Sequence, residues 1–152
     1  MLKLMRKEVF WLIKKKDVIR IKIPYPSMSS GLANSAHMYI CKECDNYRYE
    51  YVKCQTLKPY MLSNTVMKHY CDEQADINRN PFTHPTRIDC DKVFTTSLVK
   101  YDDLLKTTRK TFVCDELFQK VLCELSADGF TRERVDETEL TLLNELVTFI
   151  NE

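Results

Sequence analysis

Asp-Val-Ile-Arg-Ile-Lys-Ile, residues 17–23, is the stretch that decides the fold, and Pro24 follows it. In an extended chain its three isoleucines share one face, while Arg20 and Lys22 share the other. This alternation is typical of a strand with one buried face. Proline is poorly accepted inside a sheet because it has no N–H group to donate. Residues 17–23 therefore predict a first strand that ends where a loop begins.

Other segments either repeat this alternation or change to a helical period. A long loop is favoured by the prolines, serines and glycine that follow the first strand. Further strands are predicted at 36–41, 49–56 and 88–94. After a break, one more strand is predicted at 95–99. Helices are predicted at 2–15, 115–125 and about 136–151, with a short one near 63–70.

This order of elements predicts a mainly β protein with helices, of the α+β class, built on a small β-barrel. We expect a basic amphipathic helix at 1–16, a barrel domain at 14–126 with an irregular insertion at 57–87, and an acidic C-terminal helix at 130–152. The chain of 152 residues, with 44% hydrophobic and 30% charged residues, has the composition of one folded domain.

The net charge of +1 hides opposite charges in two parts of the chain. Residues 1–23 hold eight Lys or Arg and two acids, whereas residues 113–152 hold ten acids and three basic residues. The basic part suits a polyanion, and the acidic part either covers that basic surface or packs on the domain. The simpler interpretation is two solvated faces whose opposite signs suit each other within the fold.

Cysteine usage predicts the compartment and bears on metal binding. The chain has seven cysteines and no clean export signal, so we expect a reducing compartment, the cytoplasm. No stretch approaches the roughly 20 apolar residues that span a bilayer, so we expect no membrane partner. Cys41 and Cys44 have the spacing of half a zinc site, and His69 and Cys71 are the best second pair. That second pair is poorly formed, so the sequence favours no metal and no cofactor.

Residues 16–24 resemble the first strand of the PemK/MazF toxin family, in which a basic residue and an aspartate precede an alternating strand and a proline. In that family a long loop follows and the third strand ends in a threonine, as 49–56 does here. A Lys/Thr segment then leads into a helix, as in 97–125. The resemblance covers about residues 14–126. It implies a divergent SH3-like barrel, cleavage of single-stranded RNA without metal, a homodimer, and an antitoxin protein that covers the active surface.

The resemblance also implies where the site lies. Thr56 matches the family's threonine and is expected to donate a hydrogen bond to the scissile phosphate. The family's Arg-Pro pair would begin at Ser35 or Ala36, where this chain has no arginine, so we assign proton transfer to the neighbouring His37. The catalytic candidates are therefore His37 and Thr56. The RNA-binding candidates are Lys53, Lys58, Tyr39, Tyr49, Tyr60 and Arg20.

Three functions remain open at this point. The first is a toxin-like, metal-independent endoribonuclease or RNA-binding protein of a toxin–antitoxin system. The second, which the missing Arg-Pro pair favours, is a catalytically inactive barrel that acts as a protein-binding or inhibitory module. The third is a zinc-stapled interaction module. His37 is also interpretable as a hydrogen-bonded histidine at a barrel rim, and the strand tyrosines as core residues.

Overall fold

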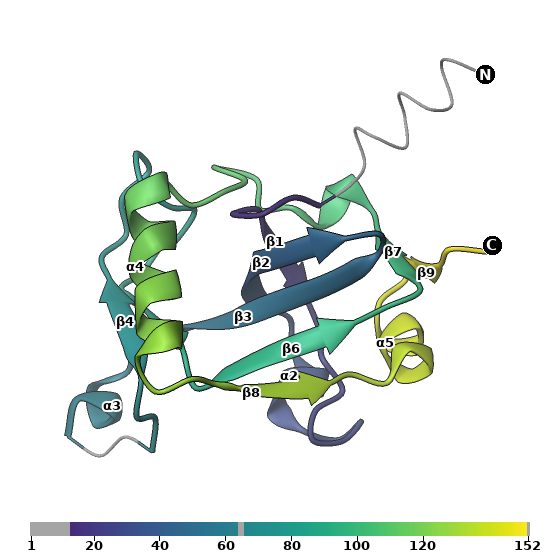
Figure 1. The fold of residues 1–152 in the computed structure, drawn as a ribbon, viewed down its shortest axis with the longest axis horizontal. Helices are drawn as coiled ribbons and strands as arrows, with labels where there is room; N and C mark the ends of the chain where they lie inside the picture. The colour runs from purple at the N-terminus through teal and green to yellow at the C-terminus, as the bar shows by residue number, and fades with distance from the viewer. Residues whose placement is uncertain (1–12, 64–65, 152) are drawn as a thin grey trace.

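A computed structural model of the chain describes residues 13–63 and 66–151 (Figure 1). They form a mainly β structure with helices, of the α+β class, whose main sheet has seven strands. In chain order the elements are β1 (Val18–Ile21), α2 (Gly31–Asn34), β2 (His37–Asp45), β3 (Arg48–Thr56), α3 (Pro59–Ser63), β4 (Tyr70–Glu73), β5 (Thr86–Asp89), β6 (Lys92–Thr96), β7 (Val99–Tyr101), η1 (Asp103–Leu105), α4 (Asp115–Ala127), β8 (Thr131–Arg134), α5 (Glu137–Leu143) and β9 (Val147–Phe149).

The main sheet is built around the hairpin of β2 and β3. Antiparallel neighbours follow the order β1-β2-β3-β5-β4, and β6 pairs with the first half of β3. A two-residue turn joins β2 to β3, and both of its residues, Asn46 and Tyr47, have positive φ, which matches the right-handed twist of the strands. The chain leaves β6, passes through α4 and returns as β8 parallel to β6. β7 and β9 form a separate two-stranded sheet.

Side chains that alternate along the strands fill two hydrophobic cores, one on each face of the sheet. On β1, Ile19 enters the first core and Val18 the second; on β3, Tyr51 enters the first and Val52 the second. Residues of β7, α5 and β9 close the first core, and α4 closes the second. Figure 1 shows α4 beside β4 and α5 next to β9. The strands β1 to β3 therefore bury apolar side chains on both faces.

The helix α4 confirms the prediction at 115–125, and its sequence accounts for both of its ends. The Cys114 sulfur accepts a hydrogen bond from the Leu117 N–H group at 3.4 Å and so caps the first turn. Gly129, with φ of 77°, follows the helix in a conformation that glycine adopts without a steric penalty. The buried side chains recur at helical steps: Leu117, Phe118, Val121 and Leu125.

The mainly β, α+β prediction is confirmed, and the strands predicted at 17–23, 36–41 and 49–56 correspond to β1, β2 and β3. The strand predicted at 88–94 is divided between β5 and β6. Within residues 13–63 and 66–151, β6 and β8 branch from β3, and the strand pairs do not close into a barrel, so the predicted SH3-like barrel is not confirmed. None of the helices in this part of the chain is long and apolar enough to cross a membrane.

The helix predicted at about 136–151 is wrong in its second half, because α5 ends at Leu143 and the chain then forms β9. Asn144 ends the helix. Its side-chain amide donates to the carbonyl oxygens of Lys22 and Leu140, both at 2.8 Å, and its side-chain oxygen accepts from the Lys22 N–H group at 2.9 Å. These bonds fasten the end of α5 to the residues that follow β1.

Other predicted boundaries also differ. The segment 130–152 is not one acidic helix, since it contributes β8, α5 and β9, and its Val135, Leu140 and Val147 lie in the first core. The short helix predicted near 63–70 is replaced by α3 and β4. The helix predicted at 1–16 lies outside the described residues except for 13–16, which are not helical.

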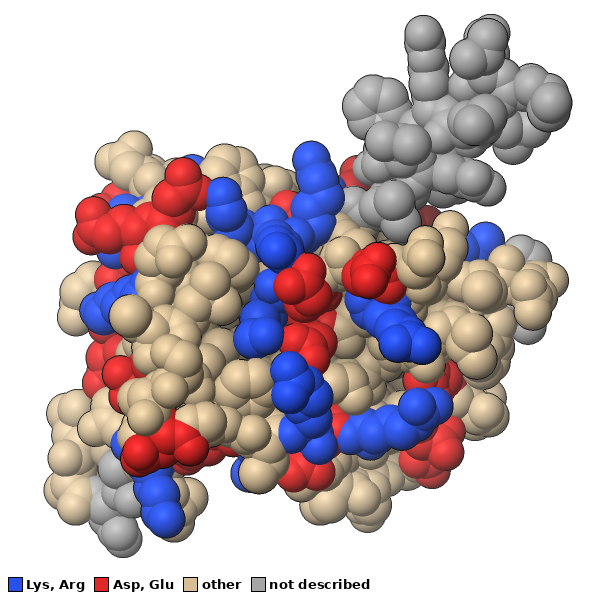
Figure 2. All heavy atoms as spheres, in the orientation of Figure 1, with Lys and Arg blue, Asp and Glu red and all other residues tan. Residues whose placement is uncertain are grey.

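The face that carries β3, β6 and β8 is not a surface of one charge. Figure 2 shows basic and acidic side chains interleaved on it. Glu50 of β3 pairs with Lys42 at 2.9 Å and with Arg132 of β8 at 2.6 Å, and Arg134 pairs with Glu137 at 3.1 Å. These pairs leave no basic patch for a polyanion on this face. The opposite charges seen in the sequence meet elsewhere, where Lys16 pairs with Asp115.

Candidate functional site

A row of side chains crosses the sheet at the end where β2 begins and β3 ends. The antiparallel register sets Arg20 of β1 beside Met38 of β2, and Met38 beside Cys54 of β3. These three residues, together with His37 and Thr56, line one cavity of about 120 Å³, hereafter the small cavity. The structure therefore brings together three residues that the sequence singles out: Arg20, His37 and Thr56.

The same register relates Thr56 to residue 36, one of the two positions at which the resemblance would place an arginine. The last pair of the β2–β3 ladder is Met38 and Cys54. Continued by two residues in each direction, the ladder sets Ala36 opposite Thr56, and both line the small cavity. A longer side chain at residue 36 would therefore enter the same space.

His37 has the arrangement of a neutral general base. Its Nδ1 lies 3.0 Å from the carbonyl oxygen of Ser35, which can only accept, so Nδ1 carries the proton and Nε2 is left with a lone pair. Burial lowers the pKa of His37, and the positive charges of Lys53 and Arg20 lower it further, against the opposing effect of the Ser35 hydrogen bond. The imidazole is therefore predominantly neutral at pH 7 and able to accept a proton.

The small cavity has the charge of a site for an anion. Arg20 is exposed and forms no ion pair with any residue in the described ranges. Thr56 is exposed as well, and its hydroxyl forms no hydrogen bond within those ranges. None of the described residues that line the cavity is acidic. A phosphate oxygen placed there would meet a guanidinium and a hydroxyl without a competing carboxylate.

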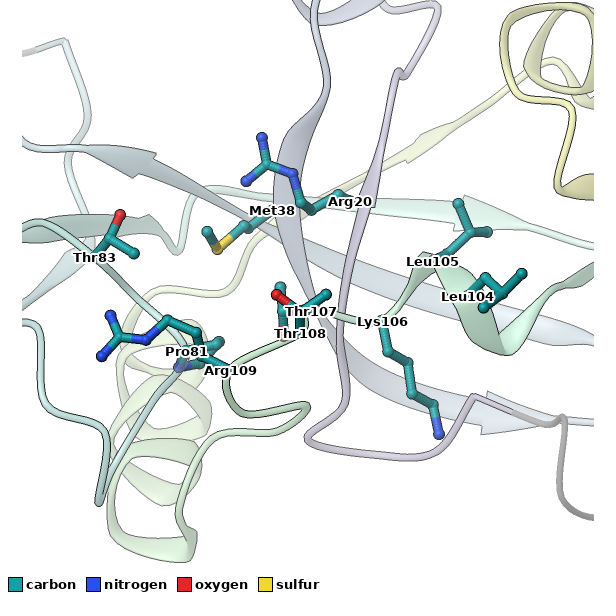
Figure 3. A pocket seen from close by; sticks show the side chains of 10 residues that line it. All are labelled: Arg20, Met38, Pro81, Thr83, Leu104, Leu105, Lys106, Thr107, Thr108 and Arg109. Carbon is teal, nitrogen blue, oxygen red and sulfur yellow. The ribbon is translucent and has the colours of Figure 1, made fainter.

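A second, larger hollow of about 280 Å³ adjoins the small cavity and shares Arg20 and Met38 with it. Its other walls include Thr83 and the loop of residues 104–109 (Figure 3). Arg109 comes from that loop, which sequence reasoning did not connect with the site. No signal in the sequence indicated the connection, because the loop is brought to β1 only by long-range contacts such as the Ile19–Lys106 bridge.

The remaining RNA-binding candidates do not line the small cavity. Tyr39 and Tyr49 are 0% and 1% exposed, so their ring faces are closed to a base and stacking by these two rings does not fit the structure. Lys58 and Tyr60 are exposed where the chain passes from β3 into α3. Lys53 is half-buried, and burial lowers its pKa; its charge acts on His37 through space.

The candidate zinc ligands are separated by the sheet. Cys41 lies in the first core with Cys44 packed against it, whereas Cys71 lies in the second core. The His69 ring contacts Glu124 and Asp128 instead of a thiol. Among the residues that the structure describes, no cluster of three or more His, Cys, Asp or Glu side chains is arranged to hold a metal ion.

The geometry of this site must be interpreted from the chain's own residues. Comparison of the sequence with the known protein families and with the curated proteins finds no match.

Proposed function

We propose that the protein binds single-stranded RNA and cleaves it without a metal ion at the small cavity. One observation carries this proposal: a neutral imidazole, an unpaired guanidinium and a free hydroxyl, from His37, Arg20 and Thr56, surround one cavity lined by no acidic side chain among the described residues. Cleavage of RNA by its own 2′-hydroxyl needs a proton acceptor and positive charge or hydrogen bonds around the phosphate. These three side chains supply both.

In this mechanism Nε2 of His37 takes the proton of the ribose 2′-hydroxyl, and the 2′-oxygen attacks the neighbouring phosphorus. The bond between phosphorus and the 5′-oxygen breaks, and that oxygen takes a proton from water while the imidazolium returns its proton to solvent. The products are a 2′,3′-cyclic phosphate and a 5′-hydroxyl. Arg20 and Thr56 bind the phosphate oxygens on which negative charge increases.

The resemblance to the PemK/MazF family supports the proposal through two positions. In the extended β2–β3 register, the position of the family's arginine, Ser35 or Ala36, meets that of its threonine, Thr56. Arg20 then supplies from β1 the positive charge that this chain lacks at residues 35 and 36. An SH3-like arrangement of the strands, a homodimer, an antitoxin partner and a cytoplasmic location belong to the same proposal.

The test is cleavage of a diverse single-stranded RNA pool in the presence of EDTA. His37→Ala should lower the rate about 100-fold or more, because a positioned general base is lost. Arg20→Gln and Thr56→Val should each lower the rate by about 10- to 100-fold, because each removes one group that binds the phosphate. The products should carry cyclic phosphate ends.

His84→Ala is the matched control, since His84 is an exposed loop histidine that does not line the small cavity. It should cleave RNA like the wild type. All variants should melt at the wild-type temperature, because the replaced side chains are exposed or half-buried. If the wild-type protein leaves the whole RNA pool intact, the proposed reaction is wrong.

A second candidate function, a non-catalytic protein-binding module, is favoured by the serine and alanine at residues 35 and 36, where the family has an arginine. The same assay separates the two functions. A module without catalysis would show no cyclic phosphate at any protein concentration, and binding to its protein partner would survive the replacement of His37 by alanine.

A further inference from the structure

The larger hollow combines walls from three separate parts of the chain. Arg20 and Met38 come from β1 and β2, Pro81 and Thr83 from the loop before β5, and Arg109 from the loop after η1. Figure 3 shows Arg20 and Arg109 coming from different elements, with the Met38 side chain between their guanidinium groups. The hollow is therefore a product of the tertiary fold rather than of one loop.

Its charge comes from the two arginines. Arg109 is exposed and, like Arg20, forms no ion pair with any residue in the described part of the chain. Lys106 also lines the hollow, but its ammonium group is paired with Asp103 at 2.9 Å and with Asp17 at 3.4 Å. Figure 3 shows the Lys106 chain pointing away from both arginines. No acidic side chain is among the described residues that line the hollow, so two positive charges stand there uncompensated.

The rest of the lining suits a ligand that has both polar and apolar parts. Thr83 and Thr108 are exposed, and their hydroxyl groups form no hydrogen bond within the described residues, so both groups are available to a ligand. Met38 is half-buried, and Leu104 is 79% exposed at the edge of the hollow. A nucleotide matches this combination, because its phosphate pairs with guanidinium groups and its base covers apolar side chains.

We infer that the larger hollow binds the nucleotide next to the scissile bond and that Arg109 binds that nucleotide's phosphate. The substrate is then held by two successive phosphates, one in each cavity, with Arg20 on the wall between them. The inference rests on the proposed function for the identity of the ligand as RNA. It adds that the shortest oligonucleotide able to make both phosphate contacts has two internucleotide phosphates.

The experiment uses 2′-O-methyl oligonucleotides, which cannot be cleaved because the attacking hydroxyl is blocked. A dinucleotide has one internucleotide phosphate and a trinucleotide has two. Wild-type protein should bind the trinucleotide about tenfold more tightly than the dinucleotide, the usual effect of one added hydrogen bond between charged groups. Arg109→Gln should bind the dinucleotide like the wild type and lose the gain for the trinucleotide.

Salt dependence gives a second readout that loss of folding would not imitate. For a longer 2′-O-methyl oligonucleotide, the slope of log K against log salt concentration should decrease in magnitude by about 0.7 in Arg109→Gln, which corresponds to one phosphate contact on a single strand. Arg48→Gln is the matched control, because Arg48 is exposed and lines neither cavity. Its affinities and slope should equal those of the wild type.

The outcomes distinguish this inference from the proposed reaction. If the protein cleaves RNA but Arg109→Gln binds both probes like the wild type, the subsite is overturned and the proposed reaction is supported. A trinucleotide gain that depends on Arg109, in a protein that cleaves nothing, supports the subsite and overturns the reaction. An acidic peptide that binds more tightly than the trinucleotide, and loses its binding in Arg109→Gln, also overturns the inference, because the hollow would then be a protein-binding site.

Discussion

Replacing Arg87 with methionine should destabilise the protein, because Arg87 is a fully buried cation in which each of the three guanidinium nitrogens has a hydrogen-bond partner. It is 1% exposed, and its guanidinium donates to the two carboxylate oxygens of Asp72 at 2.7 and 2.8 Å and to the Met61 carbonyl oxygen at 2.9 Å. The Tyr70 ring lies 3.8 Å from its central carbon. These contacts fasten α3 and β4 to β5, beside Thr86, which lines the small cavity.

The loss in the free energy of unfolding follows from the contacts that each partner of Arg87 loses. Removing one member of a buried ion pair costs about 3–5 kcal/mol, chiefly because the other charge is left without a partner. The Asp72 side chain is 34% exposed and regains water when the arginine is removed, and methionine keeps the apolar volume. We therefore expect the lower end, a loss of about 3 kcal/mol in the free energy of unfolding. For a chain of this size that corresponds to a melting temperature lower by roughly 6–12 °C.

Urea unfolding followed by circular dichroism measures this loss. Arg48→Met, at an exposed arginine, is the control and should unfold at the wild-type urea concentration. The double variant Arg87→Met with Asp72→Asn should lose less than the sum of the single variants, because it leaves no unpaired charge. A loss below about 1 kcal/mol in Arg87→Met would refute the reasoning, since it would mean that the ion pair contributes no more than an exposed one.

Three further results are expected. Asn144→Ala should lose about 1–3 kcal/mol of stability in urea unfolding, because it leaves backbone groups of Lys22 without partners in a partly buried place. The hydrogen bond to Glu124, together with that to Asp128, raises the pKa of His69. The charged ring therefore stabilises the fold fully below the unfolded pKa of 6.5, and this stabilisation is lost as the pH rises through the raised pKa of the folded state. When the melting temperature is measured against pH, His69→Gln should lack this step. Because the pKa of His37 is lowered, the cleavage rate should be flat around pH 7 and fall only below the ordinary histidine value of 6.5, as a pH–rate profile would show.

Each has an outcome that contradicts it. Wild-type stability in Asn144→Ala would mean that water replaces the amide. A wild-type pH step that persists in His69→Gln would assign it to another group. A cleavage rate that already falls when the pH is lowered to 8 would exclude a neutral His37 as the base.

The central strands and α4 were predictable because their apolar residues recur with a clear period. Residues 19–23 alternate strictly, and the residues of α4 follow helical steps, so local pattern and tertiary packing agree. β8 was missed because Thr131–Arg134 are all polar and mostly exposed, which leaves no alternation to recognise. The last helix was overestimated because its apolar period continues past Asn144, whose long-range hydrogen bonds no local pattern reveals.

The candidate site was predictable only in part, and for a related reason. His37 and Thr56 were identified from a resemblance, and Arg20 from its place on the polar face of the first strand. Their meeting in one cavity depends on the strand register, which the sequence does not state. The role inferred for Arg109 depends on a loop about 90 residues from β1, and contacts at that separation leave no periodic trace.

The first core also determines when the domain is able to fold during synthesis. Strands β1 to β3 end at residue 56, but Val135, Leu140 and Val147, which close that face of the sheet, come much later. A nascent chain that has emerged as far as residue 130 already holds Phe94 and Tyr101, which pack on Tyr39 and Tyr51, but it lacks the three side chains that complete this core. Contacts so distant in sequence slow folding, and such a chain is exposed to aggregation until residues 131–149 follow.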